Sequence, residues 1–599
     1  MSTAASSAPP AVPGFFGPFE RPLFGWLHPG DCAEPRLGVV VCSPLGYENL
    51  CCHRTLRRIA ELFAGNGVPA VRFDYDGTWD SAGSDLDPAR MSAWTSSVEA
   101  AIDALRSATG VDRICLVGIR FGATLAALAA QRRTDVAAII AIAPVVDGRR
   151  YARELRALAA TSAVDAYTNG GDHQEAAGFT MTSQTRDALA ALGPANLVPR
   201  TKTQFLILER DDLPADERWP SALGDAGMPV TRERFDGFAQ MMFDAHDAKV
   251  PQMALQRALE WLLLVRDAAP SASSDDGTRR SCDPRRVFRA RADLPGQLAE
   301  EVLQPGGKPR GFAIASMPGS SSGSQGRPLL MLLNSGAVHH VGPYRLFVGL
   351  ARQLAASGVT VVRYDLPAIG DGDADPERLD DAPYPATAVE DIHRALADLV
   401  KQFAPSEIHF GGVCAGAYHS LKAAQKGLVA RSIVVVNPLT FFWKPGLPLD
   451  AREFQVTAEA ARYQRTLFEP AAWIKLVRGE VEVRPILRTF TRRLGTRLHH
   501  IVRELKRALG WQLEDDLAAE LRVIAQRGTR VEFLFSENEP GLAMLREQGG
   551  RTVGRLERHG VLTIETIAGA DHTFSTLAPR EHLMTLVEHR ICSVGSQAS

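Results

Sequence analysis

The sequence predicts an α/β fold class: two tandem domains, each with a mostly parallel sheet covered by helices on both faces. Short, wholly apolar runs such as Val39–Cys42 alternate with amphipathic stretches such as 54–64. That alternation is typical of buried parallel strands joined by helices. The chain also repeats itself with an offset of 291 residues, which carries Asp74 onto Asp365. A repeat of this length indicates a tandem duplication.

Each copy of the repeat is expected to supply a similar set of strands. In the first copy we expect strands at 39–42, 69–74, 114–119, 139–143 and 205–208. In the second copy we expect them at 312–314, 329–333, 408–413, 433–436, 531–535 and 562–567. A closing helix is expected in each copy, at 253–265 and at 581–591.

Composition changes along the chain predict the domain boundaries. Residues 1–13 are rich in Ala, Ser and Pro and are expected to form a disordered tail. The first domain is predicted at 14–266 and the second at 287–595, with 267–286 as an exposed linker of few apolar residues. The second domain is expected to carry a helical lid insertion at about 437–528, and the two domains are expected to pack together.

Overall composition limits the classes of function. The 599 residues carry a formal net charge of -2, so no global field points to nucleic acid. The eight cysteines form no CxxC pair, which suits a reducing compartment and argues against a metal site. No apolar run approaches the roughly 20 residues of a membrane span. We therefore expect a cytoplasmic protein with no transmembrane segment, no metal and no cofactor.

A cysteine between glycines marks the candidate nucleophile. An apolar run ends at Gly411-Gly412, Cys414 follows, and helical spacing resumes after Gly416. Small residues two positions either side of a nucleophile let strand and helix approach closely in a nucleophile elbow. The alternative is a buried structural cysteine in a glycine-rich turn.

A second pattern, of the GxSxG type, is centred on Ser321. It lies in a Gly/Ser tract with no helix after it, and low complexity explains it.

The partners of such a nucleophile are expected later in the chain. His572 follows the predicted strand 562–567, and Glu539 follows the predicted strand 531–535. The chain order Cys414, Glu539, His572 suits a base oriented by an acid. Glu537 is the alternative acid, and Asp571 is expected to be solvated.

Two backbone amides are expected to form the oxyanion hole. One lies after the strand 329–333, at Gly336 or Ala337, and the other is that of Ala415. His339-His340 nearby are interpreted as loop residues and not as metal ligands, because no third ligand is apparent.

With these motifs, both halves resemble the α/β-hydrolase superfamily. More narrowly, the second half is similar to the type 1 hydrolases associated with bacterial exosortase and exopolysaccharide gene clusters, and the first half to their type 2 companions. The segments that carry this resemblance are Gly342-Pro343-Tyr344-Arg345, Val361–Asp365, Gly412-Val413-Cys414, Val436-Asn437-Pro438 and, in the first half, Gly118–Gly122. Glutamate at 539 departs from the more usual aspartate. Cysteine elbows also occur in dienelactone hydrolases and polyhydroxyalkanoate synthases, so the cysteine does not decide between hydrolysis and acyl transfer.

The first domain is expected to be a pseudoenzyme. Its degenerate elbow carries Arg120 where the second domain has Cys414, and arginine stays protonated and cannot attack an acyl carbon. The segment 235–240 has no histidine. Arg120 is expected to pair with Asp211 or Asp212, or to bind an anion in the pocket of the first domain that corresponds to an active site. Cys51-Cys52 is placed in a loop before a helix and is a weak thiol candidate.

The predicted lid contains a basic run. Between 475 and 507 there are ten Lys or Arg against three Glu. Such a run is usually a solvated helix face, but it also suits an anionic partner such as coenzyme A or a carrier protein.

The leading hypothesis is an ester or thioester hydrolase, for example a thioesterase, or an acyltransferase with a Cys414, His572, Glu539 triad. The hypothesis from another class is a non-catalytic scaffold with two degenerate elbows. Loss of thiol-probe labelling at Cys414 on His572→Ala distinguishes the two.

Overall fold

A computed structural model of the chain describes residues 9–31, 36–160, 173–176, 178–268, 283–319, 325–447, 511 and 513–592. Contacts divide the chain into two compact units. The first comprises residues 1–324, 337–382 and 575–577, and the second comprises 325–336, 383–574 and 578–599. The first unit therefore contains the first sequence repeat together with part of the second. The boundaries at 266 and 287 rest on the duplication and stay a prediction.

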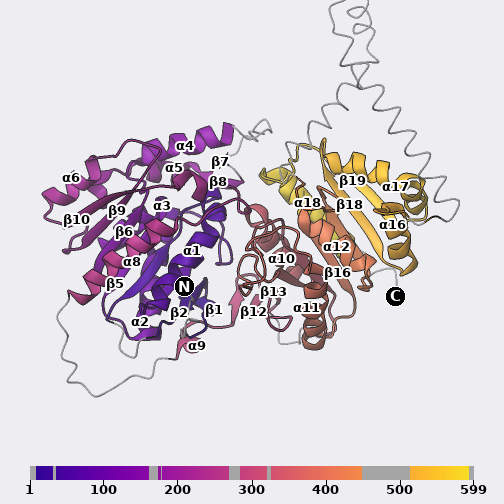
Figure 1. Cartoon of the computed structure of the whole chain (residues 1–599), viewed down its shortest axis with the longest axis horizontal. Coiled ribbons are helices and arrows are strands. Elements are labelled where there is room, and N and C mark those ends of the chain that lie inside the picture. Colours follow the sequence, from indigo (N-terminus) through magenta and orange to yellow (C-terminus); the bar gives the residue numbers. More distant parts are fainter. Residues whose placement is uncertain are drawn as a thin grey trace, which may run out of the picture. The chain divides into compact units, whose positions relative to one another are not determined.

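The first unit contains an eight-stranded sheet with the strand order β1-β2-β4-β3-β5-β6-β9-β10 (Figure 1). β1 and β2 are antiparallel to their neighbours, and the pairs from β4 to β10 are parallel. The strands are β1 (Val12–Phe16), β2 (Leu23–His28), β3 (Gly38–Cys42), β4 (Ala70–Phe73), β5 (Ile114–Ile119), β6 (Val136–Ile142), β9 (Gln204–Arg210) and β10 (Val230–Phe235). A separate hairpin pairs β7 (His173–Ala176) with β8 (Phe179–Thr182).

Helices cover both faces of this sheet. Side chains alternate across a strand, and in β3 Val39 and Val41 enter one core while Val40 and Cys42 enter the other. The first core packs against α1 (Tyr47–Gly65) and α8 (Gln252–Asp267), and the second against α2 (Arg90–Thr109) and α3 (Phe121–Ala130). The remaining helical segments of this repeat are α4 (Gly148–Ala160), α5 (Ser183–Ala190), η1 (Pro194–Leu197), α6 (Arg218–Asp225) and α7 (Phe238–Met241).

The first unit also holds four strands that follow the first repeat. They form successive antiparallel pairs in the order β11 (Arg291–Leu294), β12 (Leu298–Leu303), β13 (Phe312–Pro318) and β15 (Thr360–Asp365). The helical segments here are α9 (Pro284–Val287), η2 (Pro343–Arg345) and α10 (Leu346–Ala356).

The second unit is built on five parallel strands. Their order is β14 (Leu329–Leu333), β16 (Ile408–Val413), β17 (Ser432–Val436), β18 (Arg530–Ser536) and β19 (Leu562–Ile567). The helices are α11 (Ala388–Phe403), α12 (Ala415–Gln425), α16 (Leu517–Gln526), α17 (Pro540–Arg558) and α18 (Leu577–Cys592). Because these strands are parallel, their carboxyl ends lie at one edge, which is where ligand-binding loops gather in open α/β sheets.

These observations confirm the predicted α/β fold class with mostly parallel sheets. Two local expectations were wrong. α1 begins at Tyr47 and not near residue 54, so Cys51 and Cys52 lie inside a helix and not in a loop. Both thiols are buried, and burial raises their pKa, that of Cys51 to about 12. They are therefore poor nucleophiles.

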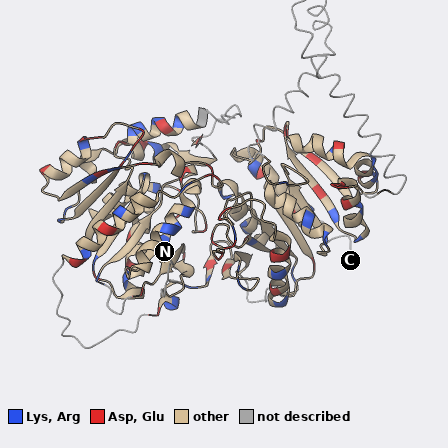
Figure 2. Ribbon diagram, viewed as in Figure 1, with Lys and Arg blue, Asp and Glu red and all other residues tan. Residues whose placement is uncertain are grey.

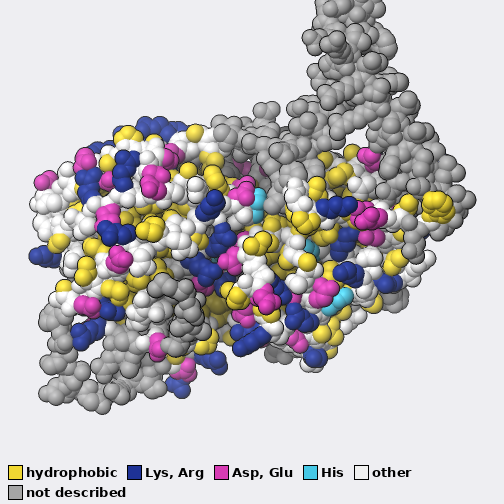
Figure 3. Space-filling view, viewed as in Figure 1, with side chains coloured by type: hydrophobic (Ala, Val, Ile, Leu, Met, Phe, Trp, Pro, Cys, Tyr) yellow, Lys and Arg dark blue, Asp and Glu magenta, His cyan; other side chains and the backbone are white. Residues whose placement is uncertain are grey.

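Several expectations fall outside the described residues. The tail before residue 9, Ser321 and residues 448–510 of the predicted lid, with its basic run, belong to this group. Figures 2 and 3 show basic and acidic residues interspersed elsewhere on the ribbon and on the displayed face. No helix among the described residues is long and apolar enough to cross a membrane.

A buried charged network lies within the first unit around His340. Its Nε2 lies 2.8 Å from an oxygen of Asp80, and its Nδ1 lies 2.8 Å from Asp365. Arg363 donates to both Asp80 and Glu300. His340 is thus in a loop, as expected, but it has carboxylate neighbours that the sequence did not reveal. Since both ring nitrogens contact carboxylates, the group forms a buried ion-pair network.

One ion pair of this network has an equivalent at the positions that the sequence repeat relates to it. Arg72 donates to Asp371 at 2.6 Å, and Arg363 donates to Asp80. The offset of 291 residues carries Arg72 onto Arg363 and Asp80 onto Asp371. The two copies therefore exchange equivalent ion pairs, as the two halves of an isologous interface do.

We expect the His340 contacts to make stability fall as the pH rises above neutral. Burial by itself lowers the pKa of His340, but Asp80 and Asp365 raise it to about 10. An unfolded histidine has a pKa of about 6.5. The stabilisation is therefore full below about pH 6.5 and is lost as the pH approaches 10. Thermal unfolding between pH 6 and 10 should show a steeper fall in Tm for wild type than for His340→Gln. Parallel curves would contradict the assignment.

Candidate active site

Cys414 occupies a strained turn between β16 and α12. Its backbone has φ 58° and ψ -114°, in the left-handed half of φ that a residue with a Cβ rarely adopts. A Cβ on Gly416 would lie 2.4 Å from the carbonyl oxygen of Leu333, and one on Gly412 would lie 2.6 Å from Gly416. Only glycine fits at both positions, because the helix start passes directly against the neighbouring strand end. The side chain of Cys414 is partly exposed.

The first repeat contains the same turn with a different side chain. Arg120 has φ 52° and ψ -120° at the junction of β5 and α3. A Cβ on Gly122 would lie 2.1 Å from the carbonyl oxygen of Cys42. The two elbows are therefore alike in backbone and in glycine packing, and they differ in the residue that each presents.

His572 and Glu539 lie side by side in the second unit. His572 Nδ1 is 3.1 Å from Glu539 Oε2, and the His572 side chain is 17% exposed. Glu539 is buried, and Ser536 Oγ donates to the same Oε2 at 3.2 Å. Glu537, the alternative acid, is exposed and accepts a hydrogen bond from the backbone of Gly569. The structure thus brings Glu539, and not Glu537, to the histidine.

Asn437 holds the strand ends in place around this pair. Its Nδ2 donates to the carbonyl oxygen of His572 at 2.7 Å and to Ser536 Oγ at 3.1 Å. Its Oδ1 accepts from the backbone N–H of Ser536 at 2.8 Å. Asn437 was identified from the sequence only as part of a motif, and its contacts show that it fixes the histidine loop against β18.

The charge on His572 depends on its neighbours. Burial by itself lowers the pKa of His572, but Glu539 and the interaction with Cys414 raise it well above its usual value. Nε2 is buried, and its contact with Cys414 is not a hydrogen bond of normal geometry. Such contacts often tighten only when substrate binds. Glu539 and Cys414 therefore favour the protonated form of His572.

Comparison with known families identifies the two halves. The Alpha/beta hydrolase family model matches residues 330–582, and the model of Serine aminopeptidase, S33 matches residues 38–209. The chain carries two alpha/beta hydrolase domains in tandem. These tandem hydrolase domains match the duplication predicted from the sequence. No curated protein matches the chain significantly.

Each of the following solved structures matches a part of this chain about as long as one of its two domains. Est1E from Butyrivibrio proteoclasticus with bound ferulic acid has 17% identity and a TM-score of 0.34, and the match covers 43% of this chain and 99% of that one. Alpha/beta hydrolase GrgF from Penicillium sp. sh18 has 16% identity and a TM-score of 0.32, with 43% and 100% covered. Mouse alpha/beta hydrolase domain-containing protein 10 has 14% identity and a TM-score of 0.29, with 43% and 98% covered.

The expected oxyanion-hole amides lie at the start of a helix and in a turn. Ala415 is the first residue of α12, where amides have no acceptor within the helix. Gly336 follows β14 in a turn with φ 62°, and a Cβ there would meet nothing within 4 Å. Ala337, the next residue, is buried. The space beside Gly336 is therefore open as far as the described residues are concerned.

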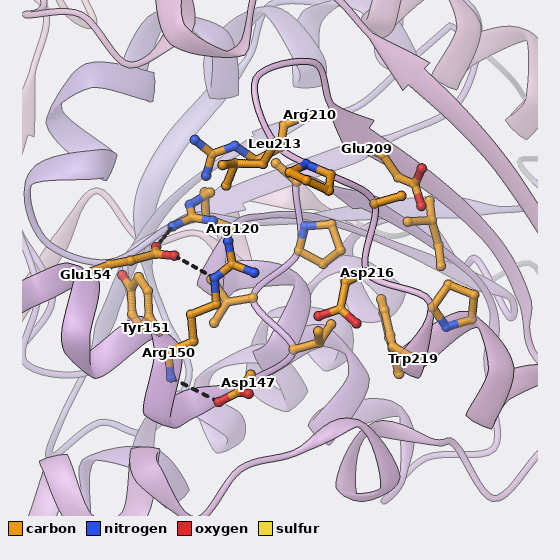
Figure 4. Close-up of a pocket in the computed structure, with 18 residues that line it drawn as sticks. Arg120, Asp147, Arg150, Tyr151, Glu154, Glu209, Arg210, Leu213, Asp216 and Trp219 are labelled. Carbon is orange, nitrogen blue, oxygen red and sulfur yellow. Dashed lines mark hydrogen bonds and ion pairs between the residues drawn. The ribbon is translucent and has the colours of Figure 1, made fainter.

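Arg120 in the first repeat is bound by two carboxylates. Its Nε donates to Glu48 at 2.7 Å and one terminal nitrogen donates to Glu154 at 2.6 Å. Figure 4 shows Glu154 and Arg120 pointing toward one another in a hollow of about 90 Å³ that Tyr151 and Trp219 also line. The guanidinium lies 5.6 Å from the centre of the Tyr151 ring.

The predicted pairing of Arg120 with Asp211 or Asp212 is wrong. Asp212 is held by Arg210 at 2.6 Å, and Asp211 accepts from the backbone N–H of Gly237. Glu48 comes from α1 and Glu154 from α4, and neither lies near Arg120 in the sequence. The interpretation of Arg120 as part of an ion pair nevertheless agrees with the contacts.

Tyr384 is a further residue near Cys414 that sequence reasoning missed. It lies between β15 and α11, with prolines on both sides, and its ring is buried. No motif marks it. The only available signal was an aromatic residue between two prolines, a pattern that restricts the backbone before and after it.

Proposed function

We propose that the second hydrolase domain is an acyl-group hydrolase or acyltransferase that uses Cys414 as nucleophile, His572 as base and then acid, and Glu539 as the residue that orients His572. The observation that carries the proposal is the contact between His572 and buried Glu539, while His572 interacts with the cysteine of a nucleophile elbow. A nucleophile, a base and an orienting acid are the parts that covalent acyl chemistry requires.

The reaction proceeds in two steps. The Cys414 thiolate attacks the acyl carbon of an ester or thioester, the new carbon–sulfur bond forms, and the bond to the leaving group breaks. The imidazolium of His572 gives its proton to the leaving group. Water, an alcohol or an amine then attacks the enzyme thioester, His572 takes a proton from it, and Cys414 leaves as a thiolate. The amides of Ala415 and of Gly336 or Ala337 stabilise the negative oxygen in both steps.

The proposal assigns no chemistry to the first domain, because Arg120 cannot act as a nucleophile. We infer a tail at 1–13, domains at 14–266 and 287–595 that pack together, and a linker at 267–286. We also propose that the acyl group arrives on coenzyme A or a carrier protein, in a cytoplasmic setting linked to exopolysaccharide production. The support is the basic run at 475–507 and the resemblance of the motifs.

Trapping of an acyl-enzyme tests the proposal. The protein is mixed with p-nitrophenyl butyrate, quenched in acid and digested, and the peptide containing Cys414 is analysed by mass spectrometry. We expect a butyryl group on Cys414 that neutral hydroxylamine removes, because thioesters react readily with it. Turnover accompanied by an acyl group on another residue would overturn the assignment. Absence of turnover with every ester and thioester would favour the scaffold hypothesis.

A further inference from the structure

The ring of Tyr384 is held rigidly beside the helix that begins after Cys414. It stacks on Trp443 with ring centres 4.3 Å apart and an interplanar angle of 14°. It also packs edge to face against Tyr418, with ring centres 5.1 Å apart. The backbone N–H of Tyr418 donates to the carbonyl oxygen of Cys414, so this wall of rings is built on the first turn of α12.

The backbone of Tyr384 is fixed as well. Pro383 and Pro385 restrict its flanks, and the carbonyl oxygen of Pro383 accepts a hydrogen bond from His419 Nε2 at 3.0 Å. His419 is buried in α12, and burial lowers its pKa to about 4, so it is neutral and has one ring N–H to donate. The loop is thereby tied to the elbow helix at the residue before Tyr384.

The hydroxyl of Tyr384 is buried and makes no hydrogen bond of normal geometry to the described residues. The residue as a whole is 9% exposed. Buried tyrosine hydroxyls usually find a partner, and an unsatisfied buried polar group costs about 1–3 kcal/mol. Each such exception in a folded protein calls for an explanation, and a role in binding or catalysis is one of them. Here Cys414 lies close enough to interact with the hydroxyl, and burial together with Cys414 raises the pKa of Tyr384. The group therefore remains a hydrogen-bond donor throughout the neutral range.

We propose that Tyr384 is a catalytic residue whose hydroxyl donates a hydrogen bond to the acyl oxygen of the substrate as negative charge develops on it. The inference rests on the proposed role of Cys414. When the acyl carbon bonds to the cysteine sulfur, its oxygen lies within about 3 Å of that sulfur, so a donor beside the sulfur can reach it. The hydroxyl, which makes no hydrogen bond of normal geometry in the free enzyme, then gains a charged acceptor in the transition state, which lowers the barrier.

Tyr384→Phe tests the proposal, because it removes one oxygen and keeps the stacked ring. We expect kcat for p-nitrophenyl butyrate to fall by about 10²- to 10³-fold, the usual effect of losing one oxyanion donor. KM and Tm should change little. Alkylation of Cys414 by iodoacetamide needs no oxyanion stabilisation, and its rate should stay within about twofold of wild type.

Tyr418→Phe is the matched control, since Tyr418 belongs to the same wall of rings, and its kcat should stay within about threefold of wild type. Tyr384→Phe with wild-type kcat would overturn the proposal. So would a loss of alkylation as large as the loss of turnover, because the hydroxyl would then act on the thiol and not on the substrate. If Cys414 is not the nucleophile, turnover will survive in Cys414→Ala. That result distinguishes failure of the proposed role of Cys414 from failure of the proposed role of Tyr384.

Discussion

Cys414→Ala is expected to abolish turnover of activated esters and thioesters, with kcat falling by about 10⁴-fold or more. Removing a covalent nucleophile leaves only the help of the oxyanion donors and of substrate binding. The side chain is partly exposed and small, so the variant should fold with a Tm close to that of wild type. Steady-state kinetics with p-nitrophenyl butyrate and thermal unfolding check both expectations.

The matched control for this variant is Arg120→Ala, the elbow position of the first domain. It leaves Glu48 and Glu154 without their shared partner and should lower the stability of the first unit. It should not change the chemical step at Cys414. A loss of kcat in Arg120→Ala as large as that in Cys414→Ala would show that the active domain has been misassigned.

Glu539→Gln is expected to lower kcat by about 10²- to 10⁴-fold and to move the alkaline limb of the pH profile to lower pH. Glu539, together with Cys414, opposes the effect of burial on His572, and without the charge of Glu539 the pKa of His572 should fall. Wild type should keep the imidazolium well above pH 6.5. In the variant the imidazolium should be lost nearer to or below that pH. The measurement is the rate of Cys414 alkylation by iodoacetamide between pH 5 and 10, together with kcat.

Glu537→Gln is the control for Glu539→Gln, since the two carboxylates stand two residues apart on the same turn. Glu537 is exposed and accepts its hydrogen bond from the backbone of Gly569 and not from His572. The pH profile of Glu537→Gln should therefore overlay that of wild type. Equal shifts in both variants would mean that general charge near the site, and not the contact with Glu539, controls His572.

The two elbows show that backbone strain alone is poor evidence for catalysis here. Arg120 and Cys414 share nearly the same dihedral angles, and Gly122 and Gly416 make the same close approach to a neighbouring strand. Strain of this kind often marks functional sites. In the first domain it persists without a nucleophile, because the crossing of strand and helix requires it. The surrounding side chains decide whether an elbow can react.

The sequence by itself determined most of the parallel strands, the duplication, the position of Cys414 in an elbow and the chain order of Glu539 and His572. Strands buried on both faces appear as continuous apolar runs, and glycines where a Cβ cannot fit mark the elbow, so both features are local. The antiparallel strands β1, β2, β11 and β12 and the early start of α1 were not predicted. β11 and β12 mix polar and apolar residues, so no apolar run marks them, and β1 contains a proline and a glycine, which are uncommon within strands.

Only the tertiary structure decided which groups meet. It paired Glu539, and not Glu537, with His572, gave Arg120 the carboxylates of Glu48 and Glu154, and placed the buried hydroxyl of Tyr384 where it interacts with Cys414. Each of these contacts joins side chains from different segments of the chain. Their energies depend on distance and burial, which spacing along a sequence does not specify.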